Sequence, residues 1–376
     1  MPMRVVITTT LNANLFRAKL VPLIRARPDV EVVVVTDREG PALDRVRWIW
    51  PRGLWRCFGR LGGRWLLLLR EVMDPRTKLV MAYNVIPHGF FAVTTARIRR
   101  LPVFLHLIAG AADVRFAHNV KVADNRLITR TRNPRRIEKL AEWTIRRAAK
   151  LCVPGTNTEN FLRSLGFPAE RIVRLHSTID PEVFHAPGGG ERDIDVLVSA
   201  QLRVRKRPVF TLEVFRRILD ARPNTRFCWL GDGPMQTEFE EALDRLGLRD
   251  AVLWTTTDGV ADYYRRARIF LLCSMNEGLS LACMEAMACG MVPITTDCGD
   301  MAEIVRPGQT GELLSVAASS EEFSEAVLRL LEDSDLWQNF SSSSQELIRS
   351  EHSYPSAIEH WRALLAPFAE KAKDLI

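Results

Sequence analysis

The feature that most constrains the fold is a regular alternation of short apolar runs with helical patterns. In the first half of the chain the apolar runs are residues 3–10, 30–37, 78–84, 101–110 and 150–156. Short buried strands separated by helices are typical of parallel sheets, because crossover helices cover both faces of such a sheet. The first half therefore predicts an α/β domain.

The same pattern returns after a break. The second set of apolar runs is residues 193–202, 225–233, 251–259, 268–274 and 291–297. The segment between the two sets, HSTIDPEVFHAPGGGERD, contains Pro187 and three glycines, which mark it as a linker. Two similar α/β halves are therefore expected, with ligands bound outside the carboxyl ends of the strands.

Charge is divided unevenly between the two halves. Residues 1–180 contain 32 Lys and Arg against 14 Asp and Glu, a net charge of +18. Residues 181–376 contain 20 against 31, a net charge of −11. This asymmetry predicts two domains, of which the first faces an anionic partner: nucleic acid, membrane lipid or a phosphorylated substrate.

The cysteines and the start of the chain suggest a reducing compartment. The seven cysteines are scattered and form no CxxC pair, so neither a zinc site nor a disulfide framework is expected. The N-terminal MPMRVVITTT lacks the pattern of a signal peptide, and no apolar run approaches the length of a spanning helix. We expect a cytoplasmic protein with free thiols.

The most informative stretch is NEGLSLACMEAMACGMVPI, residues 276–294. Its glutamates follow a predicted strand, and Ser280 is a suitable N-cap for a helix that Gly290 would end. The backbone N–H groups from Gly278 to Ala282 would then be unpaired at the positive end of a helix dipole. Such a helix start binds anions, and a diphosphate fits it.

Two glutamates flank this anion site. Glu285 lies on the second turn of the predicted helix, where its carboxylate can accept two hydrogen bonds from a ribose diol. Glu277 lies on the other side of the phosphates, where a sugar would be. Two glutamates at this spacing also occur by chance, so the pattern alone leaves both interpretations open.

Further motifs extend the pattern. The Glu277–Glu285 pair is followed by TDCGDMAEIVRPGQTGELL and preceded by WLGDGP and HSTIDPEVFHAP. In this order the segments resemble those of the family-4 retaining glycosyltransferases of GT-B fold, whose E-x7-E motif matches the two glutamates. The resemblance covers most of the chain. It implies two Rossmann-like domains that face each other across a cleft.

The resemblance also implies the domain boundaries. The family's chains cross back so that a C-terminal helix packs on the first domain, and residues 353–375 form a suitable amphipathic pattern. We therefore expect an acceptor-binding domain from residues 1–180 and 353–376, and a donor-binding domain from residues 181–352.

Roles in donor binding are carried over by position. The resemblance implies that Glu277 contacts the transferred sugar and that Glu285 binds the ribose. It also implies that Gly278, Leu279 and Ser280 offer backbone N–H groups to the diphosphate.

A phosphate-binding lysine of the family matches Lys206. The family's nearby arginine is replaced here by Gln201. Arg203 or Arg205 could supply the lost charge from a shifted position.

Matches in the first domain are weaker. The resemblance implies that His106, in FLHLIAG, approaches the anomeric centre of the sugar, although a buried core histidine is the alternative; His88 is a weaker candidate. TTTLNANLF lacks the Gly-Gly loop that the family carries after its first strand.

The resemblance implies transfer from a nucleotide-diphosphate sugar, UDP-sugar or GDP-mannose, with retained anomeric configuration. No cofactor and no metal are expected, because Lys206, an arginine and the helix start can stabilise the leaving diphosphate.

A basic, tryptophan-rich segment bears on the acceptor. Residues 45–70 contain seven arginines, no acid and four of the nine tryptophans. Interleaved Trp and Arg suit a membrane interface with anionic lipid, so we expect peripheral contact with the cytoplasmic face of the inner membrane. A second basic stretch spans residues 125–150. The alternative is a solvated basic face with the tryptophans in the core.

The expected acceptor is a lipid-linked glycan, glycolipid or polysaccharide, and a soluble acceptor with phosphate or carboxylate is the alternative. The alternative from another functional class is a basic nucleic-acid- or membrane-binding protein without transferase activity. No helix-turn-helix, zinc or RNA-recognition motif supports nucleic-acid binding, so no nucleic acid is expected. A different reaction on the same fold, such as epimerisation, also stays open.

Overall fold

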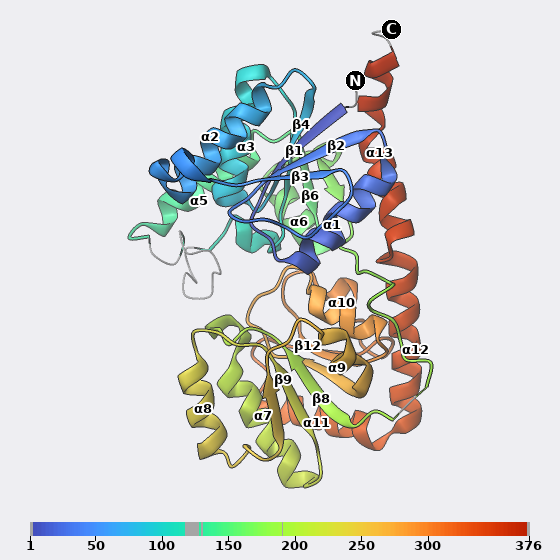
Figure 1. The fold of residues 1–376 in the computed structure, drawn as a ribbon. Helices are drawn as coiled ribbons and strands as arrows, with labels where there is room; N and C mark the ends of the chain where they lie inside the picture. Colours follow the sequence, from blue (N-terminus) through green and yellow to red (C-terminus); the bar gives the residue numbers. More distant parts are fainter. Residues whose placement is uncertain (1–2, 117–127, 129–130, 190, 374–376) are drawn as a thin grey trace. The chain divides into compact units, whose positions relative to one another are not determined.

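The computed structural model describes residues 3–116, 128, 131–189 and 191–373. The chain divides into two compact units (Figure 1). The first unit holds the described residues up to Thr178 and those from Tyr354 onward, and the second is formed by Ile179–Ser353. Part of the predicted basic stretch 125–150 lies outside the described residues.

The first unit is built on a seven-stranded parallel sheet in the order β3-β2-β1-β4-β5-β6-β7. Its strands are β1 (Met3–Thr8), β2 (Val30–Val35), β3 (Val46–Ile49), β4 (Thr77–Tyr83), β5 (Val103–His106), β6 (Lys150–Val153) and β7 (Ile172–Arg174). The strand order reverses between β1 and β4. At such a switch point the loops after neighbouring strands leave in opposite directions and open a crevice.

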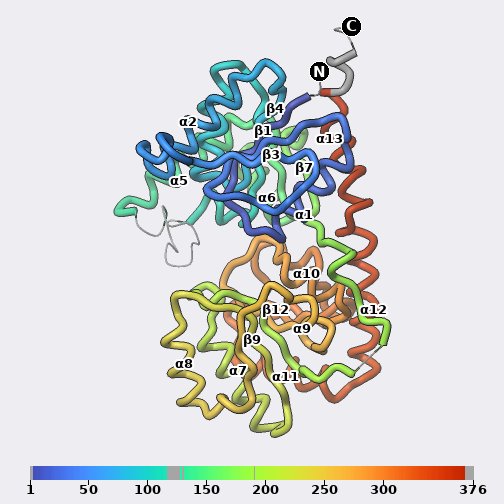
Figure 2. Tube along the Cα trace, in the orientation of Figure 1, coloured from blue at the N-terminus to red at the C-terminus, as the bar shows by residue number. Residues whose placement is uncertain are grey.

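Helices cover both faces of this sheet. They are α1 (Ala13–Ala26), α2 (Gly59–Met73), α3 (Phe90–Ala96), α5 (Pro134–Ile145), α6 (Thr156–Ser164) and α13 (Tyr354–Lys373). One core joins the sheet to α2, α3, α5 and α6, and the other joins it to α1 and α13. The helices α1 and α13, far apart in sequence, lie side by side (Figure 2).

The second unit is a six-stranded parallel sheet in the order β10-β9-β8-β11-β12-β13. Its strands are β8 (Ile194–Ser199), β9 (Phe227–Leu230), β10 (Val252–Thr255), β11 (Ala267–Leu272), β12 (Val292–Thr296) and β13 (Glu312–Leu314). Its helices are α7 (Pro208–Ala221), α8 (Gln236–Arg245), α9 (Val260–Arg266), α10 (Leu281–Ala288), α11 (Ser320–Glu332) and α12 (Ser334–Glu351).

The predicted α/β class is confirmed, and so is the packing of a C-terminal helix on the first unit, since Trp361 and Leu365 of α13 are buried there. Three edge strands, β3, β7 and β13, were not expected. They are three or four residues long and only partly buried, so they lack the apolar runs that reveal the central strands. No helix among the described residues is long and apolar enough to cross a bilayer.

Candidate functional site

The start of α10 follows β11 through a short loop, as the sequence predicts. Ser280 has extended backbone angles, and its Oγ accepts a hydrogen bond of 3.3 Å from the N–H of Cys283. Gly290, with φ of 81°, lies just after the helix. Among the described residues, the N–H groups from Gly278 to Ala282 have no hydrogen-bond partner. The predicted row of open donors is therefore present.

A second loop holds this one in place. The N–H of Asp300 donates to the carbonyl oxygen of Gly278 at 2.9 Å. Gly299 has φ of +60°, and a Cβ at this position would lie 1.9 Å from the carbonyl oxygen of Glu277. The sequence shows this position only as the glycine in TDCGD. Its contact with the loop that carries Glu277 could not be predicted without the fold.

Glu277 forms a buried ion-paired group with two cations. Its side chain is 8% exposed. Lys206 Nζ lies 2.5 Å from Oε1, and Arg205 Nη1 lies 3.2 Å from Oε2. Burial acts to raise the pKa of Glu277, but the charges of Lys206 and Arg205 outweigh it and hold that pKa below its usual value. The carboxylate is therefore ionised and positioned beside the open N–H groups.

Of the two arginines considered as replacements for the lost family arginine, Arg205 lies next to Glu277. Its carbonyl oxygen also accepts a hydrogen bond of 2.7 Å from the N–H of Met275. This bond joins the segment after β8, which carries Arg205, to the loop after β11, which carries Glu277. Arg203 instead donates from Nε to Gln201 Oε1 at 2.8 Å. The structure thus brings together Glu277, Lys206 and Arg205, whereas the predicted donor contact of Arg203 stays untested.

Glu285 has a different environment. Its side chain is 4% exposed, and burial raises its pKa to about 8. No ion pair or hydrogen bond to this carboxyl group is found among the described residues. It lies near Tyr264 of α9, whose own pKa is raised by burial and by the charge on Glu285. A ligand that donates two hydrogen bonds would favour the ionised carboxylate, as the predicted ribose contact requires.

His106 lies in the core of the first unit. It is 3% exposed and stacks on Tyr83, with ring centroids 4.2 Å apart, and Trp361 lies at 5.9 Å. Burial lowers its pKa to about 3, so the imidazole is neutral. This is the core environment considered as the alternative, and the predicted sugar contact stays untested. His88 is also buried, with Nδ1 3.0 Å from Thr8 Oγ1.

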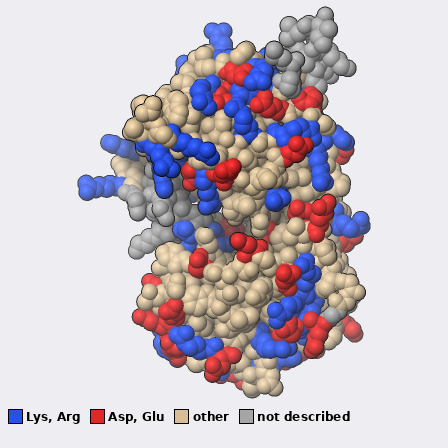
Figure 3. All heavy atoms as spheres, viewed as in Figure 1, with Lys and Arg blue, Asp and Glu red and all other residues tan. Residues whose placement is uncertain are grey.

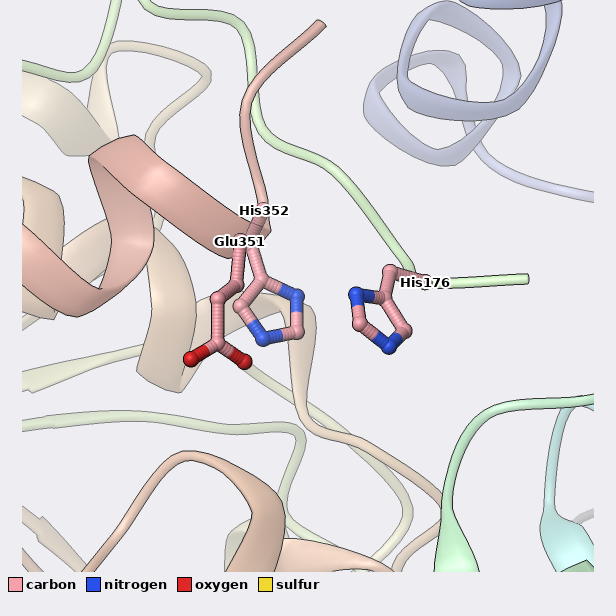
Figure 4. A group of neighbouring side chains, drawn as sticks. All are labelled: His176, Glu351 and His352. Carbon is pink, nitrogen blue, oxygen red and sulfur yellow. The ribbon is translucent and has the colours of Figure 1, made fainter. Parts of the chain in front are cut away.

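Figure 4 draws His176 together with Glu351 and His352. The last two residues lie at the C-terminal end of α12 in the second unit, whereas His176 belongs to the first unit. These three residues therefore define no site within either unit. Glu351 has an ordinary partner in Arg306, whose Nη2 lies 3.2 Å away. That no metal is required stays a prediction.

Comparison with known proteins identifies the family of this chain. A family model described as glycosyl transferases group 1 matches residues 181–347, and one described as a glycosyl transferase 4-like domain matches residues 19–178. The chain belongs to the family-4 glycosyltransferases of GT-B fold.

Among its relatives, a phosphatidylinositol N-acetylglucosaminyltransferase subunit of Arabidopsis thaliana is 27% identical over 41% of this chain and 36% of its own length. The N-acetyl-alpha-D-glucosaminyl L-malate synthase of Bacillus anthracis is 26% identical over 48% of this chain and 50% of its own length. The matched part therefore spans half or less of these two relatives.

A solved GT-B structure agrees over nearly the whole chain. HepE of Anabaena, determined in complex with UDP and glucose, superposes with a TM-score of 0.76 and covers 97% of this chain and 99% of its own. The sequence identity is 16%. At this identity the likeness shows the fold, and the predicted GT-B architecture is confirmed at that level.

Proposed function

We propose that this family-4 protein transfers a sugar from a nucleotide-diphosphate sugar to an acceptor hydroxyl, with retention of anomeric configuration and without a metal. The observation that carries the proposal is the pairing of Glu277 with Lys206 beside the open N–H groups of Gly278 to Ala282. Family membership and the GT-B fold support it.

The donor diphosphate binds at the start of α10. Its oxygens accept hydrogen bonds from the open N–H groups, and Lys206 and Arg205 supply positive charge. Glu277, already oriented by these two cations, accepts hydrogen bonds from the sugar hydroxyls. Lys206 and Arg205 therefore lie between the two parts of the donor: the sugar binds on the side of Glu277, and the diphosphate binds on the other side.

Catalysis follows from the same arrangement. Cleavage of the anomeric C–O bond leaves an oxocarbenium-like sugar and transfers negative charge to the diphosphate. Fixed N–H dipoles and the Lys206 ammonium stabilise that charge as it develops, because they are oriented before the reaction begins. The acceptor oxygen forms the new bond on the face from which the diphosphate departs, and the departing phosphate oxygen takes its proton. No protein nucleophile is assigned.

The nucleoside lies toward Glu285. A ribose diol donates two hydrogen bonds to this carboxylate. These replace the hydrogen bonds from water that the carboxylate has lost through burial. We propose a UDP-sugar as the donor, supported by the UDP in the HepE complex, and GDP-mannose is the alternative.

Membrane contact is proposed for the first unit. Leu54 and Phe58, in the 3-10 helix Gly53–Phe58, are 84% and 59% exposed. Arg52, Arg56 and Arg60 surround them in the sequence. Figure 3 shows Lys and Arg side chains gathered on the side of this unit where α2 and α5 lie. Exposed apolar side chains among arginines suit the headgroup region of an anionic bilayer.

We therefore propose a lipid-linked glycan, glycolipid or polysaccharide acceptor at the cytoplasmic face of the inner membrane. The Arabidopsis relative, named for phosphatidylinositol, supports a lipid acceptor. The Bacillus relative, named for L-malate, supports the alternative of a soluble anionic acceptor.

A thermal-shift panel tests the donor assignment. UDP, GDP, ADP, CMP and dTDP are added to the wild-type protein and to E285A. A ligand that binds the native state raises the melting temperature by mass action, and at one hundred times its Kd it adds about 2.7 kcal/mol of stability. UDP should stabilise the wild type, and E285A should lose the shift. A wild-type response to GDP alone would replace UDP-sugar by GDP-mannose, and no response to any diphosphate would contradict the proposal.

A further inference from the structure

The switch point of the first sheet contains a buried cation without an anionic partner. Arg64, on α2, is 7% exposed. Its Nε donates to the carbonyl oxygen of Arg60 at 3.1 Å, while Nη1 is buried and has no hydrogen-bond partner. Within the described part of the chain no carboxylate forms an ion pair with it. An arginine stays protonated even where burial lowers its pKa, so a full positive charge is buried here.

Arg64 lies in the second turn of α2, which leads from the carboxyl end of β3 back to the start of β4, so this part of the helix lies at the carboxyl edge of the parallel sheet. Burial lowers the pKa of Arg64, and the charge of Asp37, which follows β2, opposes this shift. The charge of Arg64 adds to the burial that lowers the pKa of His88, which follows β4. Asp37 is exposed and lies beyond ion-pair distance of the guanidinium. Arg64 therefore lies near the ends of the strands that flank the reversal of strand order.

Polar side chains from β1 and the loop after β4 complete this edge. His88 is 2% exposed, and burial, reinforced by the charge on Arg64, lowers its pKa to about 3. Its Nδ1 lies 3.0 Å from Thr8 Oγ1 and its Nε2 lies 3.3 Å from Thr10 Oγ1. Thr10 is exposed, so the group opens to solvent at that residue. Both ring nitrogens of the neutral imidazole are therefore engaged by threonine hydroxyls, and the exposed Thr10 hydroxyl can donate to a ligand without adding charge.

A buried guanidinium without an anionic partner costs stability, and natural cores rarely retain one. Its planar donors match the two oxygens of a carboxylate or phosphate. We propose that Arg64 and Thr10, with the Thr10 hydroxyl oriented by His88, form an oxyanion site that binds a phosphate or carboxylate group of the acceptor. That the oxyanion belongs to the acceptor rests on the proposed transferase function; the site itself does not.

The first experiment measures oxyanion binding by the full-length chain. Inorganic phosphate and succinate are titrated calorimetrically into the wild type, R64M, R64K and R60M. Arg60 is an exposed arginine one turn earlier on α2 and serves as the matched control. Any phosphate that binds at the start of α10 binds there in all four proteins. The difference in anion binding between the wild type and R64M therefore reports the site at Arg64 alone.

We expect R64M to lose this binding event, R64K to weaken it at least about tenfold, and R60M to keep it within about twofold. The same R64M protein should melt at a higher temperature than the wild type without added anion, because a buried uncompensated charge has been removed. Whichever of phosphate and succinate has the lower Kd indicates whether the site binds a phosphate or a carboxylate group of the acceptor. Equal anion affinity in wild type and R64M would overturn the proposal.

A second measurement separates this inference from the proposed function. If a transfer assay with a UDP-sugar succeeds, R64M should raise the acceptor KM at least about tenfold and leave the donor KM unchanged. A change in the donor KM alone would overturn the acceptor assignment. If no transfer is detected but anion binding depends on Arg64, the oxyanion site stands and the proposed function fails.

Discussion

At the scale of single residues, the two glutamates of the E-x7-E motif have opposite electrostatic environments. Glu277 is buried with two cations, which keep its pKa low. Glu285 is buried without a cation, and its pKa is raised to about 8. The first is therefore a preformed anion, whereas the second becomes charged when a ligand donates hydrogen bonds to it.

This difference predicts how stability depends on pH. The folded-state pKa of Glu285, about 8, exceeds the 4.5 of a free side chain. Its contribution to stability is therefore complete below about pH 4.5 and is lost as the pH rises through about 8. E285Q should melt at the same temperature as the wild type near pH 4, above it already near pH 6, and several degrees above it at pH 9. The exposed Glu241 provides the control, and E241Q should show no such divergence.

A second prediction separates the two candidate arginines. R205Q removes one of the two cations on Glu277, so UDP should bind about tenfold more weakly, or ~1.4 kcal/mol. R203Q removes a contact with Gln201 and leaves both cations on Glu277 in place, so it should change UDP affinity less than about twofold. Calorimetric titration with UDP decides between them. The assignment fails if R203Q is the more damaging substitution.

At the scale of elements, the site depends on two loops that touch. The loop before α10 carries Glu277, and the loop after β12 carries Gly299 and Asp300. Their backbone contact leaves no room for a side chain at Gly299. The N–H groups at the start of α10 are thus aimed by a neighbouring loop as well as by the helix itself.

Substitution of this glycine should be costly. In G299A the new Cβ would meet the carbonyl oxygen of Glu277, and the left-handed backbone adds about 1–2 kcal/mol of strain. We expect a melting temperature lower by several degrees and a loss of the UDP-dependent shift. Gly308 has φ of +73° and open space around it, so G308A carries the strain without the clash. Equal losses in the two variants would show that the loop contact is unimportant.

At the scale of the whole molecule, the net charge of +18 in residues 1–180 is the strongest bulk signal. The structure packs three of the four tryptophans of residues 45–70, namely Trp48, Trp55 and Trp65, against the cores of the first unit. Trp48 packs on Phe16 at 4.7 Å, and Trp65 donates to Thr94 Oγ1 at 3.2 Å. The exposed apolar side chains of this segment are instead Leu54 and Phe58. Part of the tryptophan content of residues 45–70 is therefore explained by packing against the core and not by membrane contact.

Vesicle sedimentation tests the membrane proposal. The wild type should bind vesicles of anionic lipid, and the double variant L54S/F58S should bind at least about 100-fold more weakly, because each of the two buried apolar side chains contributes about 1.5–3 kcal/mol. Binding should also weaken between 0.1 and 0.5 M salt, roughly as the Debye length falls. Leu253, 48% exposed in the second unit, gives the control L253S. Equal binding of all three proteins, or none to anionic vesicles, would contradict the proposal.

Most of the second unit could be predicted from local patterns. The central strands are continuous apolar runs, and α10 has a recognisable N-cap in Ser280 and a glycine after its end. The placement of Lys206 near Glu277, 71 residues away along the chain, followed only from a family resemblance. The short edge strands were missed because partial burial leaves no continuous apolar run.

By itself, the sequence determined the α/β class, the helix start with its open N–H groups and the pair of glutamates, because these depend on contacts between near neighbours in the chain. Only the tertiary structure decided that Arg205 rather than Arg203 lies at Glu277, that His106 is enclosed by Tyr83 and Trp361, and that Arg64 is buried without an anion. The reason is physical: burial and charge pairing depend on residues that are distant in the sequence, and their approach is set by the packing of helices on the sheets.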